Sequence, residues 1–208
     1  MHANNMEDII EYLKNTYSPL SIIVYGSFAD GSNNENSDFD VLVITESGSE
    51  LHDNTIVSGI VLDAFIYPKE RIVGKLDCED FLRIFDGHIV MDTDGIATKL
   101  QAKVREYINN TPPKSYAENK TNVEWCEKML LRAAREDMEG YFRWHWLLTE
   151  SLEIYCDLRK IRYLGPKKSI NRMRLEDNMS ASIYEKALAN FDYESLSAWI
   201  THLKKLLK

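Results

Sequence analysis

The first half of the chain alternates short apolar runs with polar turns, which predicts a mixture of strands and helices. Residues 20–25 (LSIIVY) form a β-branched apolar run followed at once by a glycine, a pattern typical of a buried strand. Residues 38–44 predict a second strand, and residues 55–67 predict a third that is kinked or bulged at Gly59. The other elements expected in this half are a helix around residues 6–13, a strand at 88–91 and a helix from about 95 to 108.

The second half carries apolar residues at spacings of three and four, which predicts helices only. Two long helices are expected over residues 122–136 and 141–158. Gly165 and Pro166 interrupt this pattern, and two shorter helices are expected between residues 182 and 207. Since no run here alternates like a strand, an antiparallel helical bundle is the simplest arrangement.

A break in the periodic sequence at residues 109–113 (NNTPP) divides the chain in two. Residues 1–113 carry 19 acidic and 8 basic side chains, a net charge of -11, whereas residues 114–208 carry 14 and 17, a net charge of +3. We therefore predict two domains, residues 1–112 and 113–208. The expected fold class is α+β, with an N-terminal mixed β-sheet domain flanked by helices and a C-terminal all-α bundle.

Composition narrows the class of protein further. The 208 residues are 44% hydrophobic and 28% charged, as in ordinary folded proteins, so disorder is not expected. The chain has no apolar run near the roughly 20 residues that span a bilayer, and its first residues lack the layout of a signal peptide. We expect a cytoplasmic protein without a membrane partner. The net charge of -8 disfavours sequence-specific binding of nucleic acids.

Two aspartates, Asp38 and Asp40, open the second predicted strand. Side chains at positions i and i+2 of a strand project from the same face, so the two carboxylates are expected side by side. Adjacent like charges are costly unless a cation neutralises them. Oxygen ligands at this density suit a hard ion such as Mg²⁺, which often binds through a few carboxylates and substrate phosphates.

A third carboxylate, Asp63, interrupts the otherwise apolar run IVLDAFI. An aspartate is out of place in a core, but it fits if its strand lies beside that of Asp38 and Asp40. Three carboxylates at one place would form a site for two Mg²⁺ ions.

Gly26 and Ser27, directly after the first strand, suggest a phosphate contact. A glycine allows the backbone to approach a phosphate closely, and the next N–H and the serine hydroxyl can donate to its oxygens. Gly-Ser and Asp-x-Asp are weak signals when taken singly. Their combination with a third aspartate on a following strand is much more specific.

The stretch GSFADGSNNENSDFDVLVI resembles the signature of the DNA polymerase β-like nucleotidyltransferase superfamily, in which Gly-Ser is followed about ten residues later by Asp-x-Asp. The third aspartate and the trailing helical half resemble its antibiotic nucleotidyltransferase branch and small prokaryotic relatives. The motif covers residues 20–67, and the domain order extends the resemblance over most of the chain.

The resemblance implies a role for each matching residue. Gly26 and Ser27 would hold the β- and γ-phosphates of a nucleoside triphosphate, with Ser37 as a further nucleotide-binding candidate. Asp38 and Asp40 would bind both metal ions. Asp63, the third catalytic carboxylate, would bind the ion that activates the acceptor hydroxyl.

Seven cations and no acid lie between residues 159 and 174. Two interpretations stay open for this run. It is either a solvated basic surface or a source of charge, in which Lys167 or Lys168 neutralises the triphosphate or the leaving pyrophosphate. Relatives often carry a lysine after such a Gly-Pro break, which favours Lys168.

Glu150 is the candidate general base of the helical half. It lies with Glu153 and Asp157 on one helical face, and the resemblance implies a glutamate that deprotonates the acceptor. The same stripe is also typical of the solvated side of a helix. Both interpretations stay open because general-base catalysis depends on geometry.

Two classes of function remain. The first is a magnesium-dependent enzyme that transfers a nucleoside monophosphate, AMP from ATP, to a hydroxyl of a small molecule or protein. The second is an antitoxin-like or non-catalytic nucleotide-binding partner on the same fold. Three intact aspartates and the attached helical half favour the enzyme. The acceptor, the preference among nucleoside triphosphates, any role in antibiotic resistance and the oligomeric state stay open.

Overall fold

The computed structural model describes residues 2–74 and 76–207. The chain divides into two compact units, Met1–Thr111 and Pro112–Lys208. The division falls one residue before the expected domain boundary. The first unit contains the sheet and the second contains helices, so the predicted α+β fold class is confirmed.

A mixed sheet organises the first unit. Its strands lie in the order β3-β5-β2-β1-β6, and β4 pairs with β5. The β2–β5 pair is parallel, whereas β1 pairs antiparallel with β2 and β6, and β3 and β4 pair antiparallel with β5. The strands are β1 (Ser21–Val24), β2 (Phe39–Thr45), β3 (Leu51–Asp53), β4 (Ile56–Val57), β5 (Ile60–Pro68) and β6 (His88–Asp92).

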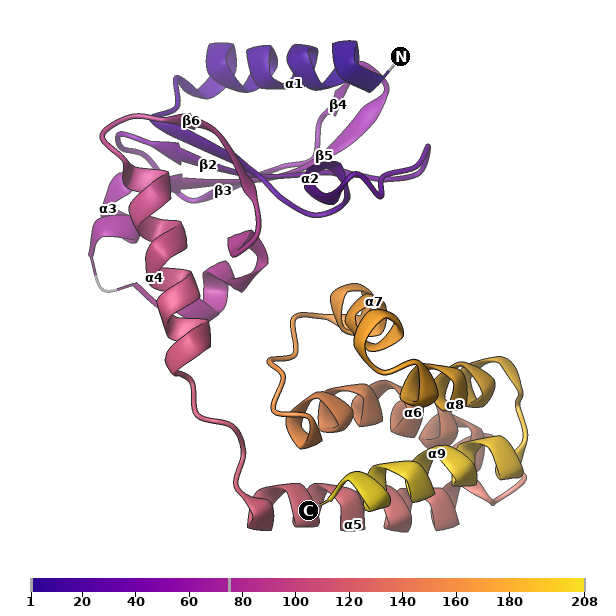
Figure 1. Cartoon of the computed structure of the whole chain (residues 1–208). Coiled ribbons are helices and arrows are strands. Elements are labelled where there is room, and N and C mark those ends of the chain that lie inside the picture. The colour runs from indigo at the N-terminus through magenta and orange to yellow at the C-terminus, as the bar shows by residue number, and fades with distance from the viewer. Residues whose placement is uncertain (1, 75, 208) are drawn as a thin grey trace. The chain divides into compact units, whose positions relative to one another are not determined.

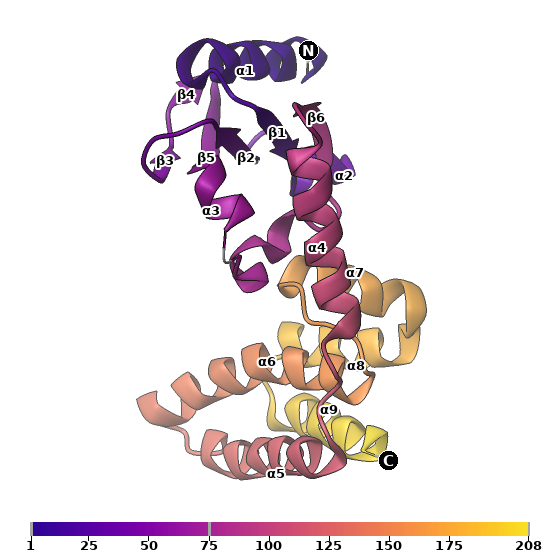
Figure 2. The same ribbon diagram turned by 90° about the vertical axis from the view of Figure 1, so that its left-hand side faces the viewer.

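Each face of the sheet packs against different helices (Figures 1 and 2). One face carries Val24, Val41 and Ala64 and packs on the apolar side of α1. The alternate strand residues, including Ile23 and Leu42, pack against α3, α4 and a 3₁₀ helix, η1. The helical segments of this unit are α1 (His2–Tyr17), α2 (Ser27–Asp30), α3 (Lys69–Val73), η1 (Cys78–Ile84) and α4 (Ile96–Asn110).

Local turn chemistry explains where the first unit differs from the sequence-based expectation. The expected kinked strand over residues 55–67 is two strands, because Ser58 and Gly59 both adopt positive φ and form the turn of a hairpin. The three residues of β3 are too few to show a period. The short segments α2, α3 and η1 were also not predicted.

The second unit is wholly helical, as predicted, but two helices differ from expectation. The first helix begins at Tyr116 because Ser115 and Glu118 form a capping box. Part of the basic run forms a helix that begins at Pro166. None of the described helices is long and apolar enough to cross a membrane. The helices are α5 (Tyr116–Ala133), α6 (Met138–Leu158), α7 (Pro166–Glu176), α8 (Asn178–Ala189) and α9 (Tyr193–Leu206).

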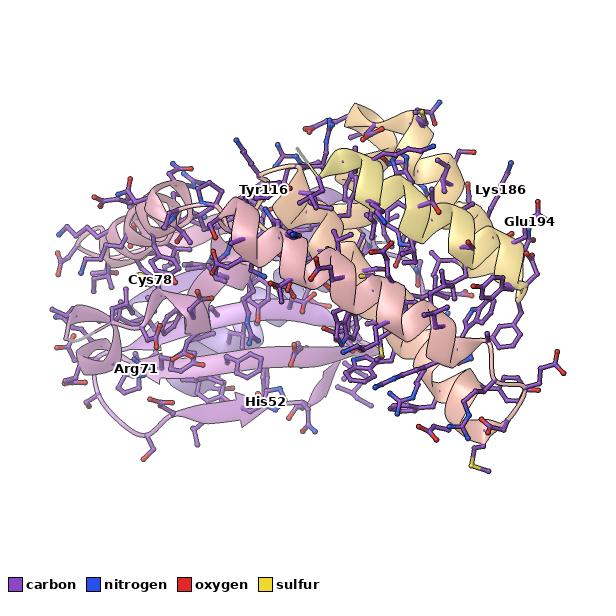
Figure 3. The ribbon with its side chains drawn as sticks, turned by 90° about the horizontal axis from the view of Figure 1, so that it is seen from below. His52, Arg71, Cys78, Tyr116, Lys186 and Glu194 are labelled. Atoms are coloured by element: carbon purple, nitrogen blue, oxygen red, sulfur yellow. The ribbon has the colours of Figure 1, made fainter. Side chains whose placement is uncertain are left out.

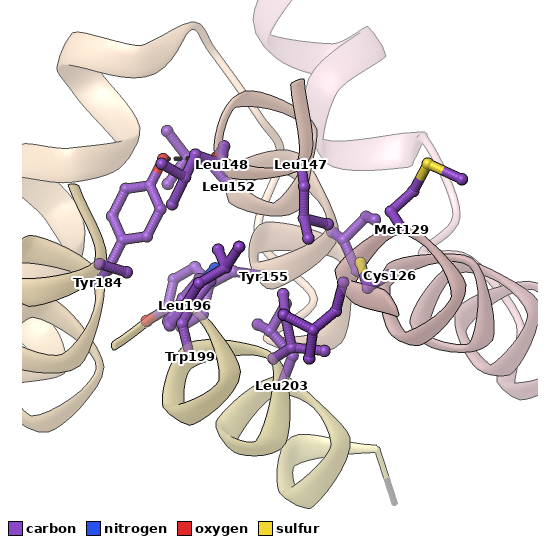
Figure 4. Close-up of a cluster of buried hydrophobic side chains, with 14 of the residues drawn as sticks. Cys126, Met129, Leu147, Leu148, Leu152, Tyr155, Tyr184, Leu196, Trp199 and Leu203 are labelled. Atoms are coloured by element: carbon purple, nitrogen blue, oxygen red, sulfur yellow. Dashed lines mark hydrogen bonds between the residues drawn. The ribbon is translucent and has the colours of Figure 1, made fainter. Parts of the chain in front are cut away.

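The core of the helical unit is built around fully buried Trp199 (Figure 4). Its indole nitrogen donates to Ser151 Oγ at 2.9 Å, so the polar atom of the ring is satisfied inside the core. Tyr184 packs against the same indole and donates its hydroxyl to the Leu148 carbonyl at 2.8 Å. Together these contacts join α6, α8 and α9 into one core.

Candidate active site

Asp40 and Asp63 lie side by side because their strands run parallel and pair in register. Asp40 on β2 is the direct partner of Asp63 on β5, which confirms the expected adjacency of the two strands. Both side chains lie on the sheet face that carries Leu42. Asp38 is exposed and directly precedes β2 rather than lying within it.

The electrostatics of Asp40 reflect this crowding. Burial raises the pKa of its carboxyl from 3.8 to about 6, and the charges of Asp63 and Asp38 add to the rise. The positive charge of Arg83 acts in the opposite direction. The three carboxylates thus form one repelling cluster, with an arginine as the nearby source of opposite charge.

Gly26 is required next to Asp40 for a steric reason. It adopts φ 66° and ψ -147°, a backbone region that side chains strongly disfavour. A Cβ atom at this position would lie 2.1 Å from Oδ2 of Asp40. The sequence suggested a close approach of backbone to phosphate, and the structure adds a close approach of backbone to carboxylate. Buried Ser27 follows as the first residue of α2.

Ser37 closes the polar loop that leads into β2. Its Oγ accepts from the Asn34 backbone N–H at 3.0 Å, and its own N–H donates to the Asn34 carbonyl at 3.1 Å. These contacts give Ser37 a local structural role. A contact with the nucleotide stays a prediction.

His52 on β3, labelled in Figure 3, was missed by sequence reasoning. Its Nε2 lies 2.7 Å from Oδ1 of Asp63. Its ring stacks on Phe65, with the ring centres 4.5 Å apart and the planes 19° apart. Both contacts arise because β3 pairs with β5 and places His52 opposite Phe65. The direct hydrogen bond orients the carboxylate of Asp63.

The donor set of the cluster suits a hard divalent cation. Asp38, Asp40 and Asp63 offer only oxygen, and the charges of Asp63 and Asp38 add to the effect of burial in raising the pKa of Asp40. Among residues 2–74 and 76–207, no group of three or more His, Cys, Asp and Glu side chains is arranged as a ready metal site. The fit to a metal therefore rests on donor chemistry and charge.

A cavity of about 430 Å³ adjoins Asp38. Its volume lies in the range of small-molecule sites. Apolar Phe28 and Val61 line it together with amide and hydroxyl groups of the loop before β2 and of the β4–β5 turn. The remaining lining residues are Asn5, Asn34, Glu35, Asn36, Ser37, Ser58, Gly59 and Ile60.

The remaining candidates belong to the helical unit. Glu150 is exposed on α6. Glu153 and Asp157 on the same face form ion pairs with Lys114, at 3.9 Å and 2.7 Å. The roles of Glu150 and of the two candidate lysines, which lie in the first turn of α7, stay predictions. The two lysines are Lys167 and Lys168.

Several cations of the basic run pair with acids of their own unit. Arg159 lies 3.7 Å from Asp177, and Arg174 lies 3.4 Å from Glu185. Arg172 pairs with Glu176 across one turn of α7 at 3.0 Å. These three arginines therefore fit the interpretation of a solvated, ion-paired surface.

Comparisons with known proteins identify a family for this chain. Residues 6–110, half of the chain, match the family model described as nucleotidyltransferase domain. A crystal structure of a nucleotidyltransferase-like protein from Exiguobacterium sibiricum 255-15 aligns with 98% of this chain and 73% of its own, at 15% identity and a TM-score of 0.42. No curated protein matches. On the family match, this chain is a nucleotidyltransferase and belongs to the nucleotidyltransferase domain family.

Proposed function

We propose that this nucleotidyltransferase transfers AMP from ATP to a hydroxyl group of a small molecule or a protein, with magnesium. The observation that carries the proposal is the pairing of Asp40 with Asp63 on one sheet face, beside Gly26 and Asp38. Clustered carboxylates next to a glycine-serine turn suit a substrate that arrives with its own divalent cations.

Asp38, Asp40 and Asp63 would hold the magnesium ions. Bound there, magnesium would supply charge neutralisation at the phosphates and a lower pKa for the acceptor hydroxyl. Ser27 offers a backbone N–H and a hydroxyl to the phosphate oxygens, and Gly26 leaves the space that keeps Asp40 in position.

The order of the strands supports a separate position for each of the two substrates. Gly26 follows β1, Asp40 lies on the neighbouring strand β2, and Asp63 lies one strand further out on β5. The triphosphate would therefore lie on the β1 side of Asp40 and the acceptor hydroxyl on the side of Asp63. His52 would keep the Asp63 carboxylate oriented towards that acceptor. Glu150 is the candidate base, by resemblance.

The choice of AMP and ATP rests on the resemblance to the antibiotic nucleotidyltransferase branch. The test is pyrophosphate release from each of the four nucleoside triphosphates, with magnesium, against a panel of aminoglycosides, nucleosides and hydroxyl-bearing proteins. Release is expected to be greatest with ATP and to disappear in Asp40→Asn. Asp80→Asn is the matched control, since Asp80 pairs with Arg71 away from the cluster.

The outcomes separate the two classes of function. Acceptor-dependent release that needs Asp40 supports the transferase. Binding of ATP without release under any condition would favour the non-catalytic nucleotide-binding partner. The absence of both binding and release would contradict the proposal.

A further inference from the structure

Arg83 is a cation fixed beside the acid cluster within the first unit. It belongs to η1, and its guanidinium carbon lies 4.6 Å from the centre of the Phe65 ring. Phe65 is two residues after Asp63 on β5, so both side chains lie on the same sheet face. The arginine is therefore positioned by the same strand that carries Asp63.

A second arginine of the unit shows what is unusual about Arg83. Arg71 lies over the ring of Phe81 at 5.6 Å, and it also forms ion pairs with Glu50, at 3.2 Å, and with Asp80. Arg83 has an equivalent aromatic contact, but no described carboxylate lies within ion-pair distance of its guanidinium. Its side chain is exposed. Arg83 thus has a fixed position and no partner of opposite charge in the described chain.

Arg83 shares one side of the sheet with the carboxylates of the active site. Its guanidinium lies over Phe65, which shares a sheet face with Asp63 and Asp40, so it lies on the side of the sheet that carries both carboxylates. The hydroxyl of Tyr25, the residue directly before Gly26, also lies close to the guanidinium. A planar guanidinium has five N–H donors, so a contact with one hydroxyl leaves donors that can bind an anion as a pair. This arrangement offers two donors to an anion bound at the cluster.

We propose that Arg83 is a catalytic residue that binds phosphate oxygens of the nucleotide, and of the pyrophosphate that leaves it, through a two-pronged contact. The proposal rests on the proposed nucleotidyl transfer. A nucleoside triphosphate carries about four negative charges, and the three carboxylates add more, so two magnesium ions leave a net negative charge at the cluster that Arg83 would offset. The contact needs no residue of the helical unit.

The test compares Arg83→Gln with Arg71→Gln as the matched control. Calorimetric titrations use ATP and inorganic pyrophosphate as probes, with magnesium and without acceptor. Loss of a charge-assisted contact should weaken the binding of both probes about 10- to 100-fold in Arg83→Gln. Arg71→Gln removes a similar aromatic contact and two ion pairs, and it should leave both affinities within about twofold.

Arg83→Lys provides a second variant in case Arg83→Gln does not fold. It keeps the charge but loses the planar fork, so both probes should bind less tightly than to the wild type. Wild-type affinity for ATP and pyrophosphate in either folded variant would overturn the role of Arg83. A wild-type protein that binds neither ATP nor another nucleoside triphosphate would instead count against the proposed function itself.

Discussion

Asp40 and Asp63 occupy directly opposite positions on β2 and β5, the parallel pair of strands in the sheet. This placement puts two negative charges together on a face where Asp40 is already partly buried. Burial, with a further effect of the charges of Asp63 and Asp38, raises the pKa of Asp40 to about 6. The cluster is therefore unfavourable for the folded protein at neutral pH in the absence of a cation.

Replacing Asp40 with Asn should consequently stabilise the metal-free protein. The substitution removes one of the repelling charges and keeps the shape of the side chain. At pH 7.5 in the presence of a chelator, we expect the midpoint of thermal unfolding to rise by a few degrees, about 2–6 °C. Asp92→Asn is a control that should change the stability in the opposite direction. Asp92 accepts hydrogen bonds from Ser21, Ala97 and Thr98, so this variant should be less stable than the wild type.

The stabilisation expected from Asp40→Asn should depend on pH, in a direction set by the raised pKa of Asp40. A carboxyl whose pKa is raised from 3.8 to about 6 binds its proton more tightly in the folded state. Protonation of Asp40 therefore stabilises the folded protein below about pH 4, and this stabilisation is lost as the pH rises through about 6. The advantage of Asp40→Asn should be absent at pH 4 and complete at pH 7.5. Denaturant titrations that show a difference independent of pH would contradict this origin.

Much of this site could be predicted from sequence because strands place alternate residues on one face. An aspartate in an apolar run marked Asp63 as a neighbour of Asp40, and the pairing of β2 with β5 confirms that adjacency. The same rule placed Asp38 on the strand as well, whereas Asp38 directly precedes β2. The hairpin at Ser58 and Gly59 was missed, since a serine at positive φ gives no sequence signal comparable to Asn-Gly.

His52 and Arg83 could not be predicted in the same way. Their contacts with Asp63 and Phe65 depend on strand pairing and on the packing of η1 over the sheet, at separations of 11 and 18 residues. No helical or strand periodicity in the sequence connects residues at such separations. The capping box of α5, by contrast, was readable as Ser115 followed three positions later by Glu118.

Asp63 should differ from Asp40 in its effect on catalysis. If it serves the acceptor side, Asp63→Asn should lower turnover by several orders of magnitude and retain much of the affinity for magnesium-ATP. Asp40→Asn should lose both. Single-turnover kinetics and calorimetry on the same samples separate the two quantities, and an equal loss of binding and turnover in Asp63→Asn would remove the distinction.

Lys168 offers a test of whether the helical unit contributes charge to the reaction. On the expectation that it contacts the triphosphate or pyrophosphate, Lys168→Ala should lower turnover roughly 10- to 1,000-fold. The double variant with Lys167→Ala covers the case in which one lysine replaces the other. Lys186→Ala on α8 is the matched control. Wild-type turnover in the double variant would assign the basic run to the solvated surface.

Gly26 provides the most direct test of the geometry around Asp40. Alanine at this position must adopt φ 66°, and its Cβ would lie 2.1 Å from Oδ2 of Asp40. The backbone conformation alone should cost about 1–3 kcal/mol of the free energy of unfolding. The contact adds a further cost or forces the carboxylate to turn away, so ATP turnover should also fall.

A double-mutant cycle separates the two contributions of Gly26→Ala. In Asp40→Ala the carboxylate is absent, so only the cost of the backbone conformation should remain. Gly26→Ala is therefore expected to lower the free energy of unfolding less in the Asp40→Ala background than in the wild type, by about 0.5–3 kcal/mol. Equal losses in the two backgrounds would show that Asp40 relaxes without cost, and retained turnover in the single variant would show that its position next to Gly26 is not required for transfer.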